Sequence, residues 1–376
     1  MSNICPYFPS CRACSLWDQK YELQKADKIR NLSTLFQLAD IAIPNEIKFI
    51  SCGEHSLRHR VDFSLRFNSE THQTEFGFIG ADRRLVPIQN CMQLSPELQK
   101  VFNEFTGFQF LLSPDTFLQK ASIRLRVGPT GLKGCWIDAA NVDIKALLDD
   151  GQLMSEFIQA GFVVEMGQKG KRVIEKDKRF KFTDPSPQIW FQASERQPLQ
   201  CLVADFTQPS WITAASLIET VNEWARLLPA VRKSPLRVVE FGAGIGLFTI
   251  PFLAEGFAVT ALEIEESSAS NLKENVANLN LLEHFNVLIG DFHRQRLGLK
   301  ADLIFVNPAR SGLKKFCDDI VKSEAHDLIY VSCFADSMIS DIVEIKSHYR
   351  IKDVRIVDQF PQTGHYETCV WLTRIE

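Results

Sequence analysis

The stretch VVEFGAGIGLF, residues 238–248, decides the fold class of this chain. A short apolar run leads into Gly242, Gly244 and Gly246, and a helical pattern follows. Glycines let the backbone approach a ligand closely, and the first turn of the following helix offers free N–H groups. The stretch therefore predicts the strand, glycine loop and helix that begin a nucleotide-binding domain.

The sequence on either side of this stretch extends the same pattern. From Pro209 onward, helical stretches alternate with short apolar segments rich in β-forming residues, which is typical of a doubly wound, mostly parallel sheet with helices on both faces. We expect an α/β, Rossmann-like domain over residues 186–376. Its seven predicted strands are LRVVEFGAG, AVTALEIE, FNVLIGD, DLIFVNP, DLIYVSC, IKDVRIVDQF and ETCVWLTRI.

The first half of the chain has a different pattern of apolar residues, and residues 1–185 are expected to form an α+β domain. Residues 21–39 have helical spacing without glycine or proline, which predicts one amphipathic helix. Short antiparallel strands are predicted up to about residue 140, followed by a helix over 144–159 and another strand pair. The strand segments are RVDFSLRFN, EFGFIG, ASIRLRVG, GCWIDAA, GFVVEMGQ and FKFTD.

Composition narrows the class of protein. With 376 residues, 45% of them apolar, the chain is long enough for two or three domains. It has no apolar run of membrane-spanning length and no export-signal pattern at its start, so we expect a cytoplasmic protein that does not enter a membrane. A net charge of -4 argues against a uniformly basic nucleic-acid binder. The lysine-rich segment 168–182 is either an RNA-backbone contact or a solvated hairpin.

The cofactor can be inferred from the residues at the strand ends. Glu263 ends the next strand about twenty residues after the glycine loop, where a carboxylate can accept hydrogen bonds from both ribose hydroxyls. A dinucleotide fingerprint would place glycine where Leu247 stands, so S-adenosylmethionine suits the E-x-G-x-G-x-G pattern better. Asp291 ends a further strand and can meet the adenine amino group. The competing interpretation is a tight turn without a ligand.

The segment FVNPARSGL, residues 305–313, points to the acceptor atom. Amino-group methyltransferases carry an aromatic ring after N-P-P, and here Arg310 stands in its place, which favours a carbon acceptor. Uracil C5 is a poor nucleophile until a thiolate adds to C6. Cys333, just past the fifth strand, is the candidate nucleophile, and Glu367, beside the last strand, is the candidate base. The other interpretation of Cys333 is a buried core cysteine, which we assign instead to Cys52, Cys135, Cys201, Cys317 and Cys369.

Three cysteines lie close together at the N-terminus, Cys5, Cys11 and Cys14, with C-x5-C-x2-C spacing. Cys91, in a proline-flanked loop of the first half, is the best candidate for a fourth ligand. Four thiolates suit a 4Fe-4S cluster or zinc, and the spacing does not separate the two. Unpaired reduced thiols are the alternative.

Together the stretches NPARSG, SC after a strand and HYET resemble the RNA uracil-5-methyltransferase family over the whole chain. The resemblance implies that Cys333 is the nucleophile and Glu367 the base. Gln192 in IWFQAS, Glu263 and Asn307 then match the family's contacts to S-adenosylmethionine. The chain departs from the family pattern at Gly242, where an aromatic residue is usual, and also at Ala309 and Phe334.

The resemblance also implies partners. It is strongest to the subgroup that acts on 23S ribosomal RNA and carries a 4Fe-4S cluster, which favours iron and sulfide over zinc at the four cysteines. The helix over 21–39 is expected to pack on the catalytic domain, while the first half binds RNA. We expect a monomer. A tRNA target and a non-catalytic RNA-binding relative remain the alternatives.

Overall fold

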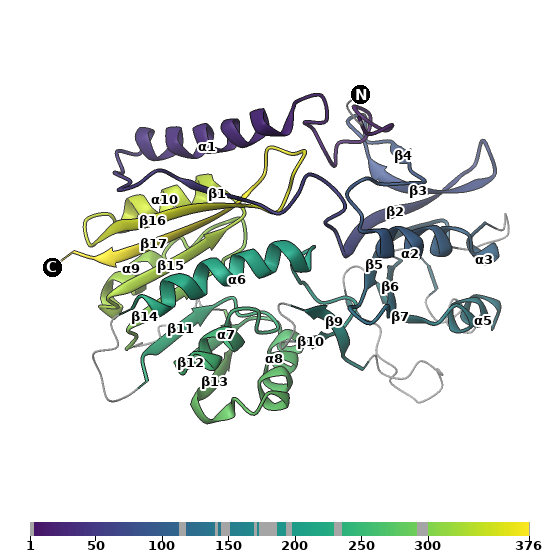
Figure 1. Ribbon diagram of the computed structural model, residues 1–376. Helices are drawn as coiled ribbons and strands as arrows, with labels where there is room; N and C mark the ends of the chain where they lie inside the picture. The colour runs from purple at the N-terminus through teal and green to yellow at the C-terminus, as the bar shows by residue number, and fades with distance from the viewer. Residues whose placement is uncertain are drawn as a thin grey trace. The chain divides into compact units, whose positions relative to one another are not determined.

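The computed structural model divides the chain into two compact units, each with its own sheet (Figure 1). Unit 1 comprises Met1–Asp18, His55–Gln192 and Gln200–Trp211, and unit 2 comprises Gln19–Glu54, Ala193–Leu199 and Ile212–Glu376. The residues that the structure describes are 4–112, 118–139, 142–143, 151–168, 171–172, 186–192, 198–228, 235–291 and 300–375.

Unit 2 contains an eight-stranded sheet in the order β1-β16-β17-β15-β14-β11-β12-β13. Neighbouring strands are parallel except at β17, which runs antiparallel to both β15 and β16. This confirms the predicted doubly wound, mostly parallel sheet. The strands are β1 (Lys48–Ser51), β11 (Arg237–Phe241), β12 (Ala258–Glu263), β13 (Phe285–Ile289), β14 (Leu303–Val306), β15 (Asp327–Ser332), β16 (Tyr349–Asp358) and β17 (Glu367–Arg374).

Helices cover both faces of this sheet. On one face, α1 (Tyr21–Leu38), α9 (Phe316–Ser323) and α10 (Ala335–Ile345) share one apolar core with alternate residues of the central strands, such as Ile304 and Val306. On the other face, Phe305 contacts α7 (Thr249–Ala254), and Trp371 lies against Trp224 of α6 (Trp211–Arg226). Helix α8 (Glu266–Asn278) contacts β12 and β13. Alternation of side chains along each buried strand therefore supplies two cores.

Helix α1 begins at Tyr21, as predicted, and ends at Leu38. Its buried stripe contains three polar residues, Tyr21, Gln24 and Lys28, followed by Leu32 and Phe36. Only the second half of this stripe joins the apolar core, so the first half must be held by polar partners.

Unit 1 contains a seven-stranded sheet in the order β4-β3-β2-β5-β6-β7-β8. Its apolar face packs against α2 (Pro96–Thr106), α3 (Gln109–Leu112) and α5 (Gly151–Gln159) through rings such as Phe63, Phe105 and Phe157. The strands are β2 (Arg60–Asn68), β3 (Gln73–Ile79), β4 (Leu85–Pro87), β5 (Lys120–Val127), β6 (Lys133–Asp138), β7 (Phe162–Gln168) and β8 (Lys171–Arg172). A separate pair consists of β9 (Gln188–Gln192) and β10 (Pro198–Cys201).

One expectation for the first half needs correction. The run of strands up to residue 140 is interrupted by α2, whose start is fixed by Ser95 Oγ accepting a hydrogen bond from Leu98 N. β7, for which no pairing partner in the earlier strands was predicted, runs parallel to β6, and α5 forms the crossover between them. Of the predicted helix over 144–159, residues 144–150 lie outside the described part, as do FKFTD and most of segment 168–182.

The units divide the chain differently from a single boundary at residue 185. Residues 19–54, with α1 and β1, belong to unit 2. Residues Gln200–Trp211 belong to unit 1. No helix in the described ranges is long and apolar enough to span a membrane.

The cysteines assigned to the core are mostly found there. Cys135, Cys201, Cys317 and Cys369 are buried, as predicted. Cys52 is only half-buried, and its Sγ lies 3.2 Å from Ser216 Oγ, so its assignment to the core was wrong. It directly follows the edge strand β1, where the sheet gives less cover.

Candidate active site

The antiparallel pairing of β15 with β17 brings the two proposed reacting groups together. Ser332, the last residue of β15, pairs with Thr368. Cys333 follows Ser332 in the chain, and Glu367 precedes Thr368. Because the two strands are antiparallel, Cys333 and Glu367 lie opposite one another. Both lie at the edge where the parallel strands end, which is where open α/β sheets bind ligands.

Glu367 is a buried carboxyl group whose two oxygens have different surroundings. Gln359 Nε2 donates a hydrogen bond of 3.0 Å to Oε1, whereas Oε2 has no hydrogen-bond partner among the described residues. Burial raises the pKa of Glu367 to about 7, and the hydrogen bond from Gln359 and the charge of Arg310 work against that rise. A carboxyl group with a pKa near neutrality is suited to act as a general base.

Cys333 is half-buried and directly precedes the N-cap of α10. Burial and the nearby Glu367 raise the pKa of its thiol, and a hydrogen bond and the charge of Arg310 lower it. The resting thiol is therefore protonated at neutral pH, and loss of that proton must accompany its attack on a substrate.

The backbone around Cys333 is fixed by its neighbour Ser332. Ser332 Oγ accepts a hydrogen bond of 3.1 Å from Phe334 N and donates one of 3.0 Å to Phe334 O. These bonds close a tight loop over Cys333 between the end of β15 and the start of α10. Phe334 itself is 37% exposed at the head of the helix.

Arg310 is the functional residue that the sequence pattern did not identify as such. Its side chain acts on both Cys333 and Glu367, and it also lowers the pKa of His365. The sequence was interpreted only as lacking an aromatic ring at this position. The signal that could have found it is its position three residues after Asn307, at the same sheet edge as the other two groups.

The glycine loop after β11 has the conformation that the sequence predicts. Gly242 and Gly244 have φ angles of 74° and 56°, a left-handed region that favours glycine. A Cβ atom at Gly242 would lie 3.0 Å from Asn307 O. An aromatic side chain at this position would therefore be strained, which gives the departure from the family pattern a local structural reason.

Glu263 fastens this loop from the end of β12. Gly244 N donates a hydrogen bond of 2.7 Å to Glu263 Oε2, and Glu265 N donates one of 2.9 Å to Oε1. Each carboxylate oxygen can accept a further hydrogen bond, so a pair of ligand hydroxyls can still be bound.

Asp291 and Asn307 complete the row of residues at this edge. Asp291 follows β13 and Gly290, whose N donates to Glu263 O at 2.9 Å. Asn307 follows β14, and its N donates to Phe241 O at 3.3 Å. The structure thus brings five of the six predicted cofactor contacts to one sheet edge.

Gln192 is the sixth, and its contact with the cofactor stays a prediction. It ends β9 and belongs to unit 1. Another glutamine two residues after an aromatic residue is Gln208, in the stretch Phe206-Thr207-Gln208 of the loop before α6. Phe206 is 68% exposed, whereas Gln208 is buried.

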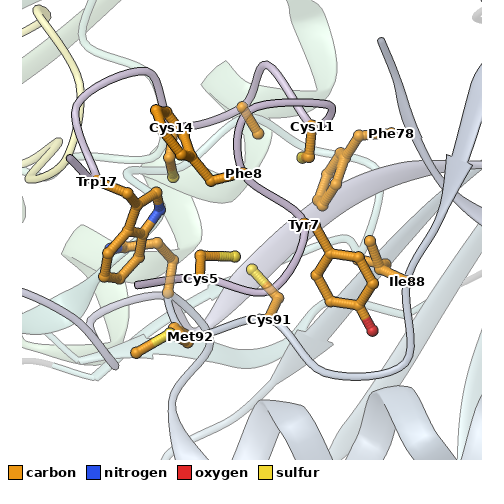
Figure 2. Close-up of a pocket in the computed structure, with 12 residues that line it drawn as sticks. Cys5, Tyr7, Phe8, Cys11, Cys14, Trp17, Phe78, Ile88, Cys91 and Met92 are labelled. Carbon is orange, nitrogen blue, oxygen red and sulfur yellow. The ribbon is translucent and has the colours of Figure 1, made fainter. Parts of the chain in front are cut away.

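The four cysteines predicted to bind a metal line one pocket of unit 1 (Figure 2). Cys5, Cys11 and Cys14 come from the N-terminal loop, Cys91 comes from the loop after β4, and Tyr7 and Trp17 complete the wall. In Figure 2 the side chains of Cys5 and Cys91 point toward one another.

These thiols are gathered but not arranged as ligands. No three His, Cys, Asp or Glu side chains in the described part of the chain are arranged to hold a metal ion. Burial raises the pKa of Cys11 and Cys91, and raises that of Cys14 to about 12, so the thiols keep their protons. Metal binding would remove these protons and draw the thiols together. The presence of four thiols in one pocket therefore says more about a cluster site than their present geometry does.

Comparison with known proteins gives related sequences and a related fold. A family model described as tRNA (Uracil-5-)-methyltransferase matches residues 195–375. An uncharacterized RNA methyltransferase of Bdellovibrio bacteriovorus is 37% identical over 98% of this chain and 95% of the relative. The 23S rRNA (uracil(747)-C(5))-methyltransferase RlmC of Citrobacter koseri is 31% identical, over 47% of this chain and 46% of the relative.

The fold of the whole chain also has a counterpart among solved structures. A tRNA (uracil-54, C5)-methyltransferase of Pyrococcus abyssi, solved with S-adenosyl-L-homocysteine, superposes with a TM-score of 0.69. The match covers 97% of this chain and 86% of that one at 19% identity, so it bears on the fold alone.

Proposed function

This chain belongs to the RNA uracil-5-methyltransferase family, whose members depend on S-adenosylmethionine, and we propose that it methylates C5 of a uridine in 23S ribosomal RNA through a covalent Cys333 intermediate. The placement of Cys333 opposite Glu367, with Arg310 acting on both, is the single observation that carries the proposed mechanism. It brings a thiol, a carboxyl group and a guanidinium group to one sheet edge, which supports the proposed roles.

The reaction follows from these three groups. The thiolate of Cys333 adds to C6, and the electrons of the C5–C6 double bond move onto C5 and the adjacent carbonyl. C5 then displaces the methyl group from the sulfonium, leaving S-adenosylhomocysteine. Glu367 removes the C5 proton, the thiolate leaves C6, and the double bond re-forms. Arg310 favours the thiolate before attack and again when it leaves. The base must leave its stack for Cys333 to reach C6.

RNA that contains 5-fluorouridine tests the covalent step, because fluorine at C5 cannot be removed as a proton. The unmodified protein with S-adenosylmethionine should form a denaturation-resistant adduct, and Cys333→Ala should form none. Glu367→Gln should accumulate a methylated adduct with ordinary uridine RNA, because elimination needs the base. Cys52→Ala, another half-buried thiol of unit 2, is the matched control. Absence of any adduct with the unmodified protein would exclude the mechanism.

The RNA class is the finer part of the proposal. Similarity to the RlmC relative over 47% of this chain favours 23S rRNA. A tRNA target is the second candidate, because the matching family model is described as tRNA (Uracil-5-)-methyltransferase. Mass mapping of rRNA and tRNA from a strain without the gene separates the two, since only one pool should lose a 5-methyluridine.

We further propose that Cys5, Cys11, Cys14 and Cys91 hold a 4Fe-4S cluster. The donor set fits, because four thiols surround one pocket without a histidine in its lining. Such a cluster would cross-link the N-terminal loop to the loop after β4 and so stabilise unit 1. Protein purified without oxygen should contain iron and acid-labile sulfide, and Cys91→Ser should lose both. One bound zinc ion without sulfide would contradict the proposal.

A further inference from the structure

The different surroundings of the two Glu367 oxygens depend on Gln359. Its side-chain amide lies between two groups, accepting a hydrogen bond of 2.8 Å from Thr213 Oγ1 and donating one of 3.0 Å to Glu367 Oε1. An ionised carboxylate only accepts hydrogen bonds, so the NH2 group of Gln359 must face it. Thr213, which is fully buried on α6, fixes that orientation because its hydroxyl group donates to the amide oxygen of Gln359.

The backbone that carries Gln359 is held from the other side by α1. Lys28 Nζ donates to Asp358 Oδ1 at 2.7 Å and to Phe360 O at 3.1 Å, so it contacts both neighbours of Gln359 in the chain. Gln24 exchanges two hydrogen bonds with Gln362, through Gln362 N at 3.0 Å and Gln362 Oε1 at 2.8 Å. Two polar residues of the buried stripe on α1, Gln24 and Lys28, therefore have partners at the end of β16 and in the loop that follows it.

We propose that Gln359 is a positioning residue for the general base: it occupies Glu367 Oε1 and leaves Oε2 as the oxygen that receives the C5 proton. This inference rests on the proposed role of Glu367. Oε2 is buried and has no partner among the described residues, so a substrate proton meets no competing donor there. Without Gln359 the carboxyl group could rotate and would lose a hydrogen bond that favours its charged form.

The groups that face Glu367 set the direction of the expected pH effect. Arg310 favours the carboxylate, Cys333 and Cys369 are the titratable neighbours whose pKa values it raises, and Gln359 is the neutral donor. Loss of the Gln359 hydrogen bond raises the pKa of Glu367. The base is then protonated over a wider pH range, so the methylation rate should fall most at neutral pH.

Gln359→Leu keeps the size of the side chain and removes its hydrogen bonds. At neutral pH its kcat should be about fivefold lower, because the rise of kcat with pH should move upward by about one unit from about 7, which is the usual effect of one hydrogen bond to a charged group. The deficit should shrink in alkaline buffer, and KM for the RNA should not change. The adduct with 5-fluorouridine RNA should still form, because that step needs Cys333 and not the base.

Gln362→Leu is the matched control, since it removes a buried glutamine from the same loop and does not touch Glu367. It should lower the melting temperature and leave the pH profile in place. Two results would overturn the inference, provided that the wild type is active. Either the dependence of kcat on pH is the same in Gln359→Leu as in the wild type, or kcat falls by the same factor at every pH. Failure of the proposed function would differ, because the unmodified protein itself would form no adduct.

If Gln359→Leu does not fold, Thr213→Val decides. It frees the amide of Gln359 to turn and should shift the pH profile in the same direction by a smaller amount. An unshifted profile for a folded, active Thr213→Val protein would then count against the inference.

Discussion

At the scale of single residues, Arg310 is the group on which both reacting side chains depend. Arg310→Gln should raise the pKa of Cys333 and of Glu367 together, because the cation lowers both in the native protein. Adduct formation with 5-fluorouridine RNA should slow at neutral pH and recover partly in alkaline buffer. In this respect it differs from Gln359→Leu, which spares the adduct. The measurement is the rate of adduct formation against pH.

Lys315→Gln supplies the comparison for that variant. Lys315 is an exposed cation five residues further along the same loop, at the N-cap of α9. Its removal changes the local charge by the same amount without contact to the reacting groups. Equal slowing in both variants would mean that Arg310 acts only through general attraction for RNA.

The residues of the site differ in how far the sequence could predict them. Cys333 and Glu367 follow or begin apolar strands, so their place at the ligand-binding edge follows from the pattern of strands. Arg310 and Gln359 occupy loops, where the sequence does not indicate which side chain turns inward. Gln359 in particular depends on Thr213, about 146 positions away in the chain, and no local pattern could show that contact.

At the scale of elements, the contact of α1 with the loop after β16 should be worth much more than the ion pairs on its surface. Lys28 and Asp358 form a buried pair, with side-chain exposures of 2% and 0%. Lys28→Met leaves Asp358 as an uncompensated buried charge and should cost about 3–5 kcal/mol of unfolding free energy. The double variant Lys28→Met, Asp358→Asn should recover a large part of this, as measured by denaturant unfolding.

The same helix offers a matched control for this prediction. Arg30 and Asp27 form an exposed i,i+3 pair at 2.8 Å, two residues from Lys28. Arg30→Met should cost less than about 1 kcal/mol, because an exposed ion pair is screened by water. A Lys28→Met cost as small as that of Arg30→Met would show that the loop is not held by α1.

The two candidate glutamines, Gln192 and Gln208, give a further test at this scale. Gln192 ends a strand of the two-stranded β9–β10 pair, whereas Gln208 is buried in the loop before α6. Gln192→Ala and Gln208→Ala should therefore be measured side by side for S-adenosylmethionine affinity by calorimetry. We expect Gln192→Ala to weaken S-adenosylmethionine binding more than Gln208→Ala does. If Gln208→Ala has the larger effect, Gln208 and not Gln192 is the cofactor contact.

Elements with strong periodicity were predicted, and those with short or mixed patterns were not. All seven strand segments of unit 2 lie within one to three residues of their predicted places, because each is an apolar run between turn residues. β1 was missed because four residues cannot show a period, and its pairing with β16 is set by tertiary contact. α2 carried a readable signal, Ser95 followed by Pro96, that the surrounding strand pattern obscured.

At the scale of the whole molecule, two buried carboxyl groups make stability depend on pH. Burial raises the pKa of Glu240 to about 8 and that of Glu367 to about 7, from ordinary values of 4.5. Because these groups bind protons more tightly in the folded protein than in the unfolded chain, the folded state is favoured at low pH. The free energy of unfolding that these two groups contribute is largest below about pH 4.5. It falls as the pH rises from there through their pKa values in the folded protein.

Glu240→Gln isolates the larger of the two effects without touching a reacting group. Thr249 Oγ1 donates to Glu240 Oε2 at 2.5 Å, and a glutamine oxygen can accept the same bond. The pKa change from 4.5 to about 8 corresponds to at most about 5 kcal/mol lost on ionisation, and the neutral amide escapes this loss. The melting temperature of Glu240→Gln should therefore gain on that of wild type as the pH rises from about 6 to 9. Glu266→Gln, on the exposed start of α8, should follow wild type throughout. A constant difference between Glu240→Gln and wild type across this range would mean that Glu240 does not titrate in the folded protein.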